Sequence, residues 1–370
     1  MLEHGGTDLG PAVAWDFSTN ANPLPACEHL SMALAAADRR RYPEPSYLHL
    51  RERLALAGLG DAERILPTAG SAEAIRRLTL MACLRGASQV WTPWPGFGEY
   101  AAAAEALGLT VQRHSGIDGL AEGVRACRAA GDHAPMLVWL CDPCNPTGRC
   151  LSESAWRQLA DLCVAHDLTL AVDLAYQPLR WPLSPPAAPG QGALPECVRG
   201  IAWQLWSPNK ALGLTGVRAG ALVAPAKAQR PDIDRLLQLA PSWVLSAEGV
   251  ALLQAWCEPE VQVWLTDCAQ QLATWRDELA CELSALGWSV HDDSPSGSQS
   301  TSVVPFLLAR PPEGESAAHV LQRCRAAGIR LRDASSLGLP GWLRLRAHVP
   351  EARQALLACL RNSQQVEARA

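Results

Sequence analysis

The chain has 370 residues, of which 48% are hydrophobic and 19% charged, and its formal net charge is −5. This length favours two domains over a single core, and the composition is that of an ordinary globular protein. The negative net charge gives no sign of a basic surface that would bind nucleic acid. The N-terminus lacks the basic and apolar regions of a signal peptide. No apolar run is long enough to span a bilayer. We therefore expect a cytoplasmic protein without a nucleic-acid or membrane partner.

The first part of the chain predicts an α/β fold. Residues 1–45 are expected to be rich in loops, because NANPLP and YPEP are turn signals. From about 50 to 240, short apolar strands alternate with amphipathic helices, which predicts a mostly parallel sheet covered by helices on both faces. The expected strands are 89–94, 135–141, 168–175, 201–206 and 216–224, and the expected helices include 71–86 and 152–167.

The last part of the chain predicts a smaller α+β unit. Residues 241–290 are expected to form a long helix, and a Ser- and Gly-rich loop follows at 292–302. The expected elements after it are strands near 303–309, 329–333 and 342–348, and helices around 317–328 and from about 350. We therefore expect an N-terminal arm that forms part of the small domain, a large domain and a C-terminal small domain, at 1–45, 46–245 and 246–370.

The segment LCDPCNPTGRC, residues 140–150, holds three of the 13 cysteines and a turn motif. Cys141 and Cys144 have the Cys-x-x-Cys spacing of zinc sites and redox dithiols. One such pair, without a second pair or a His pair, is a weak signal for zinc. In a reducing compartment the cysteines are better explained as small buried apolar residues. The turn residues 145–148, NPTG, are the alternative carriers of function.

Only two of the 32 basic residues are lysines, Lys210 and Lys227. Lys210 follows the apolar strand 201–206, where burial favours the neutral amine that forms a Schiff base. An ordinary surface lysine is the alternative, and Lys227 in APAKAQRPD fits it. Ser207 and Arg218 flank Lys210 and could both bind one phosphate.

Two further sequence signals are compatible with a ligand that carries a phosphate and reacts with the Lys210 amine. Asp173 ends an apolar strand, where ligands bind in parallel sheets, although a helix-capping Asp is the alternative. Gly70 and Ser71 lie at a helix start, where backbone N–H groups and the helix dipole favour an anion, although a simple helix start also explains them. An amine, a strand-end carboxylate and phosphate-binding groups together match the needs of pyridoxal 5'-phosphate (PLP).

The order of these motifs resembles fold-type I PLP-dependent enzymes of the aminotransferase superfamily over almost the whole chain. The motifs are AGS at a helix start, NPTG, D-x-A-Y, and S-x-x-K followed by G-x-R. The resemblance implies that Lys210 is the Schiff-base lysine and that Asp173 is the partner of the pyridine nitrogen. It implies that Asn145 and Tyr176 bind the ring hydroxyl. The implied phosphate cradle is Gly70, Ser71, Ala72, Ser207 and Arg218.

The same resemblance implies three more roles. Phe97 in WPGFGEY is in the place of the aromatic that stacks on the cofactor ring. Arg344 in WLRLRAH matches the arginine that binds the substrate α-carboxylate. Tyr42 in RYPEP resembles the tyrosine that reaches the phosphate of the neighbouring subunit, which requires a homodimer.

Two branches of the superfamily are nearest, histidinol-phosphate aminotransferases and threonine-phosphate decarboxylases of cobalamin biosynthesis. The opening His4-Gly5-Gly6, followed by DFSTNANPLP, resembles the decarboxylases, whereas the aminotransferases usually have glutamate in place of Ala21. The resemblance thus implies decarboxylation of L-threonine O-3-phosphate to (R)-1-amino-2-propanol O-2-phosphate. The alternative is transamination of histidinol phosphate or a similar amino acid with 2-oxoglutarate. His4 and Asn20 are candidates for the substrate-phosphate pocket from their position alone.

Overall fold

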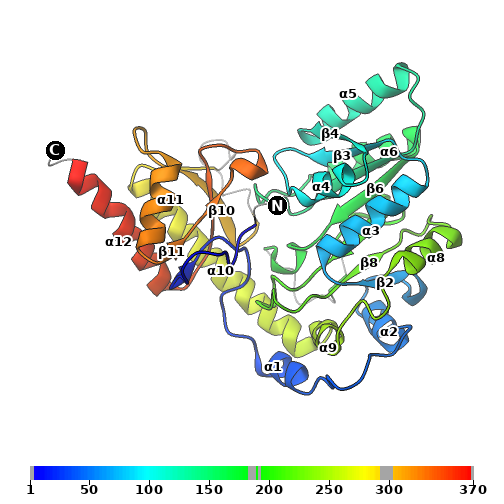
Figure 1. Cartoon of the computed structure of the whole chain (residues 1–370), viewed down its shortest axis with the longest axis horizontal. Coiled ribbons are helices and arrows are strands. Elements are labelled where there is room, and N and C mark those ends of the chain that lie inside the picture. The colour runs from blue at the N-terminus through cyan, green and yellow to red at the C-terminus, as the bar shows by residue number, and fades with distance from the viewer. Residues whose placement is uncertain (1–3, 182–188, 191–192, 292–302, 368–370) are drawn as a thin grey trace.

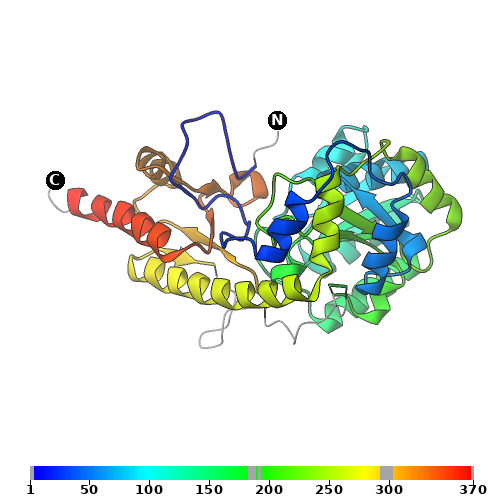
Figure 2. The same ribbon diagram turned by 90° about the horizontal axis from the view of Figure 1, so that it is seen from below.

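The computed structural model describes residues 4–181, 189–190, 193–291 and 303–367. The expected loop at 292–302 lies outside these residues. The described chain forms two lobes, and the long helix α10, Pro259–Ala285, runs from one to the other (Figures 1 and 2). No helix in the described ranges is both long and apolar enough to cross a membrane.

The larger lobe is built on a seven-stranded sheet with the strand order β2-β8-β7-β6-β5-β3-β4. Neighbouring strands are parallel, except that β8 runs antiparallel to β2 and β7. The expected α/β fold with a mostly parallel sheet is confirmed. The strands are β2 Ile65–Thr68, β3 Gln89–Pro93, β4 Thr110–His114, β5 Met136–Cys141, β6 Leu168–Asp173, β7 Ala202–Trp206 and β8 Gly220–Val223.

Helices cover both faces of this sheet. Along β5, Leu137 and Trp139 pack in one core cluster with residues of α3, α4 and α8, while Val138 and Leu140 pack in another with residues of α2, α5 and α6. Successive strand residues point to opposite faces, so a strand covered on both sides is continuously apolar. The helices are α1 Glu28–Ala35, α2 Leu48–Leu56, α3 Ser71–Leu84, α4 Glu99–Glu105, α5 Gly116–Ala129, α6 Glu153–His166, α7 Glu196–Arg199, α8 Arg230–Leu239 and α9 Ala247–Trp256.

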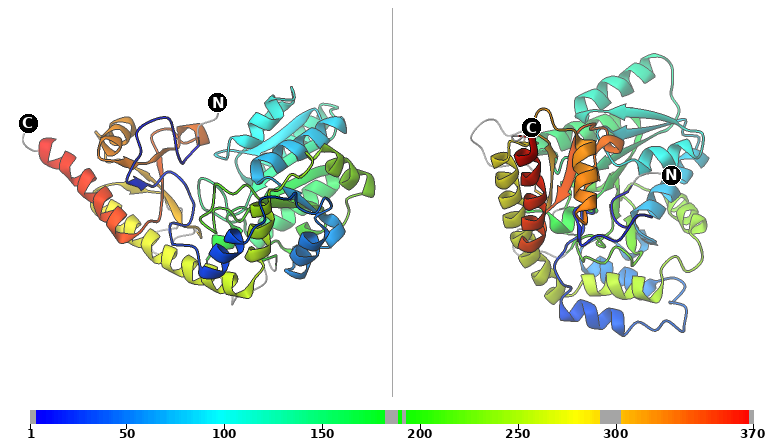
Figure 3. Two further views of the ribbon diagram at one scale, coloured as in Figure 1. Left: turned by 60° about the horizontal axis from the view of Figure 1, so that its bottom comes forward. Right: turned by 60° about the vertical axis from the view of Figure 1, so that its left-hand side comes forward.

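The smaller lobe contains a four-stranded antiparallel sheet in the order β12-β13-β10-β9. The end of α10, together with α11 and α12, packs on it through a separate apolar core. The N-terminal strand β1, Trp15–Asp16, pairs with β11, Ile329–Arg330, so the arm follows this lobe before it crosses to α1 beside α9 and α10 (Figure 3). The other elements are β9 Ser289–Val290, β10 Phe306–Arg310, α11 Ala317–Ala326, β12 Arg332–Asp333, β13 Leu343–Arg346 and α12 Pro350–Glu367.

The expectation of one long helix over 241–290 is wrong. The segment contains two helices, α9 and α10, which are separated at Cys257 and Glu258. Pro259 is the first residue of α10, and proline disfavours helical backbone in the residue before it. The start of α9 is set by Ser246, whose side chain accepts a hydrogen bond from the Gly249 N–H at 3.1 Å.

Candidate active site

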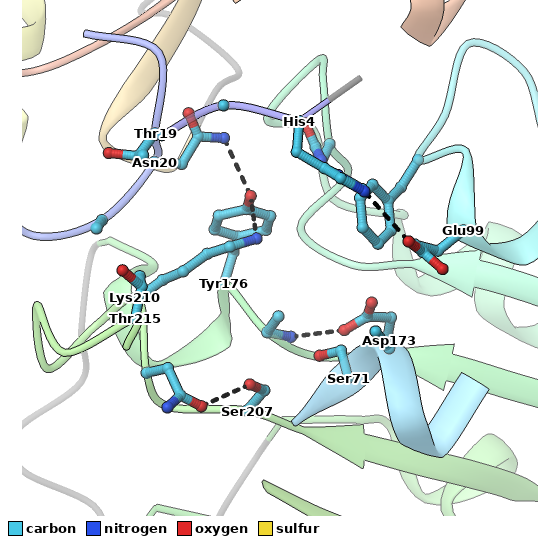
Figure 4. Close-up of a pocket in the computed structure, with 18 of the residues that line it drawn as sticks. His4, Thr19, Asn20, Ser71, Glu99, Asp173, Tyr176, Ser207, Lys210 and Thr215 are labelled. Atoms are coloured by element: carbon cyan, nitrogen blue, oxygen red, sulfur yellow. Dashed lines mark hydrogen bonds and ion pairs between the residues drawn. The ribbon is translucent and has the colours of Figure 1, made fainter. Parts of the chain in front are cut away.

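A cavity of about 450 Å³ lies at the carboxyl ends of β5, β6 and β7, three neighbouring strands of the large sheet. Its walls come from three regions: residues 4–7 and 19–21 of the N-terminal arm, the large lobe, and residues 332–344 of the smaller lobe. The carboxyl edge of a parallel sheet is the usual ligand site in such folds. Most of the residues singled out from the sequence meet here (Figure 4).

Lys210 lies in the loop after β7, and its amine points into the cavity (Figure 4). The Lys210 Nζ is 2.7 Å from the Tyr176 hydroxyl, and the Asn20 Nδ2 donates to the same hydroxyl at 3.0 Å. The backbone around the lysine is held as well, because the Asn22 N–H donates to the Lys210 carbonyl at 2.7 Å. The N-terminal arm therefore contacts the backbone of the Lys210 loop directly through Asn22. It contacts the Lys210 amine indirectly, through the Tyr176 hydroxyl that Asn20 also binds.

Asp173 is the last residue of β6 and is buried, with 3% of its surface exposed. Its Oδ2 accepts a hydrogen bond from the Tyr100 hydroxyl at 2.8 Å, and its Oδ1 accepts one from the Ala175 N–H at 3.0 Å. Burial raises the pKa of Asp173, while the positive charge of Lys210 and these two hydrogen bonds lower it. A carboxylate in this setting gains from a cationic partner in the cavity.

Asn145 follows β5 in a turn that is closed by hydrogen bonds between Cys144 and the backbone of Gly148 and Arg149. It is buried, and its Oδ1 accepts a hydrogen bond from the Arg344 Nη1 at 2.5 Å. The side-chain amide oxygen of Asn145 therefore binds Arg344 of the smaller lobe. Its amide nitrogen is the donor that can face a ligand.

Arg344 on β13 is a buried cation that lines the cavity. Its second contact is from Nη2 to the Ser18 carbonyl, at 2.9 Å, so both acceptors are uncharged. Burial lowers the pKa of Arg344 to about 10, which still leaves the guanidinium charged near neutral pH. Within the described ranges no carboxylate lies at ion-pair distance from it. A charge buried in this way favours an anionic ligand.

Another part of the cavity wall has the features of an anion site. Helix α3 begins at Ser71, and its preceding residue Gly70 has a φ of 83°. A Cβ on Gly70 would lie 2.4 Å from the Arg218 Nη2, so glycine lets the guanidinium approach the helix start. The side chain of Arg218 is held by a hydrogen bond from its Nη1 to the Thr215 carbonyl, at 3.1 Å. Ala72 has no polar side-chain atom, so this residue can contribute only its backbone.

Ser207 adds a hydroxyl to this anion site and is oriented by Asn209. The Ser207 hydroxyl donates to the Asn209 Oδ1 at 2.9 Å, and the Asn209 Nδ2 donates to the Val217 carbonyl. Both Asn209 and Thr215 line the cavity. Neither was predicted, because a polar residue in a loop carries no signal of what it contacts.

His4, near the N-terminus, also lines the cavity and lies near Glu99 (Figure 4). The ring centroids of His4 and Phe97 are 6.0 Å apart, and the His4 Nε2 lies 3.2 Å from the Glu99 Oε1. The other oxygen of Glu99 accepts from the Arg76 Nη2 at 3.1 Å. Glu99 is buried and was not predicted from the sequence.

Tyr42 and the cysteines behave differently from the residues above. Tyr42 is 76% exposed and stacks on Trp243 outside the cavity, with ring centroids 4.3 Å apart. Its predicted contact with a neighbouring subunit therefore stays a prediction.

Burial raises the pKa of Cys141, Cys144 and Cys150, which disfavours reactive thiolates. The described residues contain no cluster of three His, Cys, Asp or Glu side chains that could hold a metal ion.

Comparison with known proteins identifies the family. Residues 14–359 match the family "Aminotransferase class I and II". The chain belongs to this family. A histidinol-phosphate aminotransferase of Ruegeria pomeroyi is 31% identical over 345 residues, which cover 91% of this chain and 87% of that protein. A protein of the same name from Jannaschia is 30% identical over 372 residues, covering 97% of this chain and 94% of its own.

The fold agrees with the family assignment. A structure of aspartate aminotransferase from Thermus thermophilus, a double mutant, superposes with a TM-score of 0.73 and 21% identity, covering 94% of this chain and 91% of the other. Enzymes of this aminotransferase family use PLP. The cavity has polar groups suited to each part of that cofactor: an amine for its aldehyde, a buried carboxylate for its ring nitrogen, and a helix start with an arginine for its phosphate.

Mutations can distinguish a role of the cysteines in segment 140–150 from a role of its turn in PLP binding. Replacing Cys141 and Cys144 together with Ser is expected to leave PLP binding largely unchanged. Asn145→Ala is expected to weaken it ~10-fold, since it removes a buried amide and leaves the Arg344 Nη1 without this partner. Titration of the PLP-free protein with PLP measures both. Greater damage from the cysteine changes would contradict the assignment of function to the turn.

Proposed function

We propose that this protein acts on a small phosphorylated amino compound, with transamination of histidinol phosphate or a similar amino acid with 2-oxoglutarate as its reaction. The names of its relatives from Ruegeria and Jannaschia support this substrate. One observation supports amine chemistry at this site most directly: the Lys210 amine lies 2.7 Å from the Tyr176 hydroxyl. The same cavity is lined by Asp173 and by the buried cation Arg344.

In this proposal the residues around Lys210 hold the cofactor. The Lys210 amine would bind the cofactor aldehyde, Asp173 would pair with the ring nitrogen, and Asn145 and Tyr176 would bind the ring hydroxyl. Phe97 would pack against the ring. PLP, when bound, withdraws electrons from the carbon that carries the substrate amine. The groups proposed for its phosphate are Gly70, Ser71, Ala72, Ser207 and Arg218.

The residues proposed for the reaction itself move a proton and orient the substrate. Lys210, once its amine is free, can take the proton from the substrate carbon that carries the amine, and it would deliver that proton to the aldehyde carbon of PLP. The Tyr176 hydroxyl, 2.7 Å away, can hold the lysine amine in place. Arg344 pairs with the anionic group of the substrate, a carboxylate or a phosphate, both of which suit a guanidinium. When Arg344 holds the anionic group of the substrate, only some of the bonds at the substrate carbon can face the Lys210 amine.

Decarboxylation of L-threonine O-3-phosphate is a second candidate, which the N-terminal segment favours. A Cβ on Gly5 would lie 2.1 Å from the Ser18 carbonyl, and the Gly6 N–H donates to the Ser18 hydroxyl at 2.8 Å. The two glycines thus let the segment pack closely, with His4 at the cavity. Ala21, in the place of the glutamate usual in histidinol-phosphate aminotransferases, also lines the cavity. These features match the resemblance of the opening motif to the decarboxylases.

The proposal includes a homodimer. Tyr42 and Trp243 form an exposed stacked pair, and the hydrophobic side chain of Met32 is exposed on the nearby helix α1. Together with Met32, Tyr42 lines a second hollow formed by α1, α9 and the segment 36–44. This exposed apolar surface supports contact with a second copy of the chain, in which Tyr42 would reach the neighbouring cofactor phosphate.

One assay separates the two candidate reactions. Purified protein with PLP is given histidinol phosphate or threonine O-3-phosphate, each with and without 2-oxoglutarate. We expect turnover of histidinol phosphate that depends strictly on 2-oxoglutarate and releases no CO2. Release of CO2 from threonine O-3-phosphate without any 2-oxo acid would instead establish the decarboxylase. Failure of both substrates in a protein that binds PLP would reject both assignments.

A further inference from the structure

Tyr100, the second residue of α4, is a fully buried tyrosine that lines the cavity. Its ring stacks nearly parallel on Trp139 of β5, with centroids 5.0 Å apart and planes at 14°. The same ring meets Phe97 edge to face, at 5.7 Å and 86°. It therefore lies between the sheet and the aromatic side chain that we place against the cofactor ring.

The hydroxyl of Tyr100 is aimed at Asp173, whose Oδ2 accepts its hydrogen bond at 2.8 Å. A tyrosine needed only for packing has no use for this hydroxyl, because a buried polar group is costly without a partner. Burial, and next the negative charge of Asp173, raises the pKa of Tyr100 well above its ordinary value. The Tyr100 hydroxyl therefore stays protonated and donates a hydrogen bond to the Asp173 carboxylate.

The carboxylate of Asp173 is consequently held on both sides. The Ala175 N–H binds its Oδ1 at 3.0 Å, and Tyr100 binds its Oδ2. Cys141, which pairs with Asp173 in the sheet register, directs its thiol to the Pro143 carbonyl at 3.2 Å. Hydrogen bonds to the charged form of a carboxylate stabilise that form.

We propose that Tyr100 is a positioning residue of the PLP site: its hydroxyl keeps Asp173 an oriented carboxylate opposite the pyridine nitrogen, and its ring supports Phe97. The inference rests on the cofactor role proposed above for Asp173, and it goes beyond it by naming the group that holds Asp173 in that role. It does not depend on which substrate the enzyme uses.

The test is Tyr100→Phe, which removes one oxygen atom and keeps the ring contacts with Trp139 and Phe97. Tyr47→Phe is the matched control. Tyr47 is also buried, and its hydroxyl exchanges hydrogen bonds with the Leu245 backbone at 3.2 and 3.0 Å, away from the cavity. PLP affinity of the cofactor-free protein, the absorbance spectrum of the bound cofactor and the melting temperature without cofactor are measured for both.

We expect Tyr100→Phe to weaken PLP binding at least ~10-fold and to change the spectrum of the bound cofactor, because a hydrogen bond to a charged group is lost. Tyr47→Phe should lower the melting temperature and leave both cofactor readouts at the wild-type values. Wild-type affinity and spectrum in Tyr100→Phe would overturn the proposal. Equal losses of affinity in both variants would also overturn it, because they would reflect general destabilisation.

Tyr100→Leu tests the support of Phe97 separately, since it removes the ring as well as the hydroxyl. Its PLP affinity should fall at least ~10-fold below that of Tyr100→Phe, because the aromatic contacts are lost too. Equal affinities would show that the ring contributes nothing to the site. These measurements use no substrate, so a protein that passes them but converts neither histidinol phosphate nor threonine phosphate would overturn only the proposed function.

Discussion

Lys210→Ala is expected to lower turnover by at least ~10²–10⁴-fold, the contribution typical of a positioned acid–base group, and also to remove the covalent link to PLP. The amine lies 2.7 Å from the Tyr176 hydroxyl, and no other lysine lines the cavity among the described residues. Borohydride treatment followed by peptide mass spectrometry is expected to find the cofactor adduct on Lys210 in the wild type and no adduct in the variant.

Lys227→Ala is the control for this experiment. Lys227 is exposed, lies outside the cavity and is the only other lysine of the chain. This variant should keep both the adduct and the activity. An adduct on Lys227, or normal turnover in Lys210→Ala, would show that the site has been assigned to the wrong residue.

Arg344→Ala is expected to raise the KM for the anionic substrate ~100-fold or more. Removing one partner of a buried charge pair typically costs about 3–5 kcal/mol, and here the remaining partner would be the substrate anion. Steady-state kinetics with each substrate in turn measures the change. A loss confined to kcat, with KM unchanged, would mean that Arg344 does not bind the substrate directly.

Arg346→Ala is the matched control for Arg344→Ala. Arg346 lies two residues along the same strand, is partly buried and does not line the cavity. Its Nη1 donates to the Ala21 carbonyl at 2.9 Å, so its loss should lower thermal stability. KM should stay near the wild-type value. A similar rise in KM in both variants would point to a general displacement of the smaller lobe.

The residues at strand ends could be predicted because local pattern and topology agree. Asp173 and the turn at Asn145 follow apolar runs, and runs of that kind are buried strands of a parallel sheet. In a parallel sheet the carboxyl ends share one edge, so polar residues there come together. The helix error at 241–290 has a local cause, since Pro259 already marks a helix start.

Other members of the site could not be found in this way. Tyr100 and Glu99 lie in a helix whose sequence says nothing of a contact with Asp173 or with His4. Asn20 was a candidate from its position, but its hydrogen bond to Tyr176, 156 residues away along the chain, was not predicted. Such contacts depend on how the arm and the two lobes pack, which no local pattern encodes.

The sequence by itself determined the α/β fold, the family resemblance and the residues proposed to hold PLP, because these depend on periodicity and on motifs whose spacing is local. Only the tertiary structure decided that Arg344 is a buried cation bound to neutral groups, that Asn20 meets Tyr176 and Lys210, and that Tyr100 holds Asp173. The physical reason is that burial and hydrogen bonding at this cavity arise between segments far apart in the chain, where each partner is set by packing.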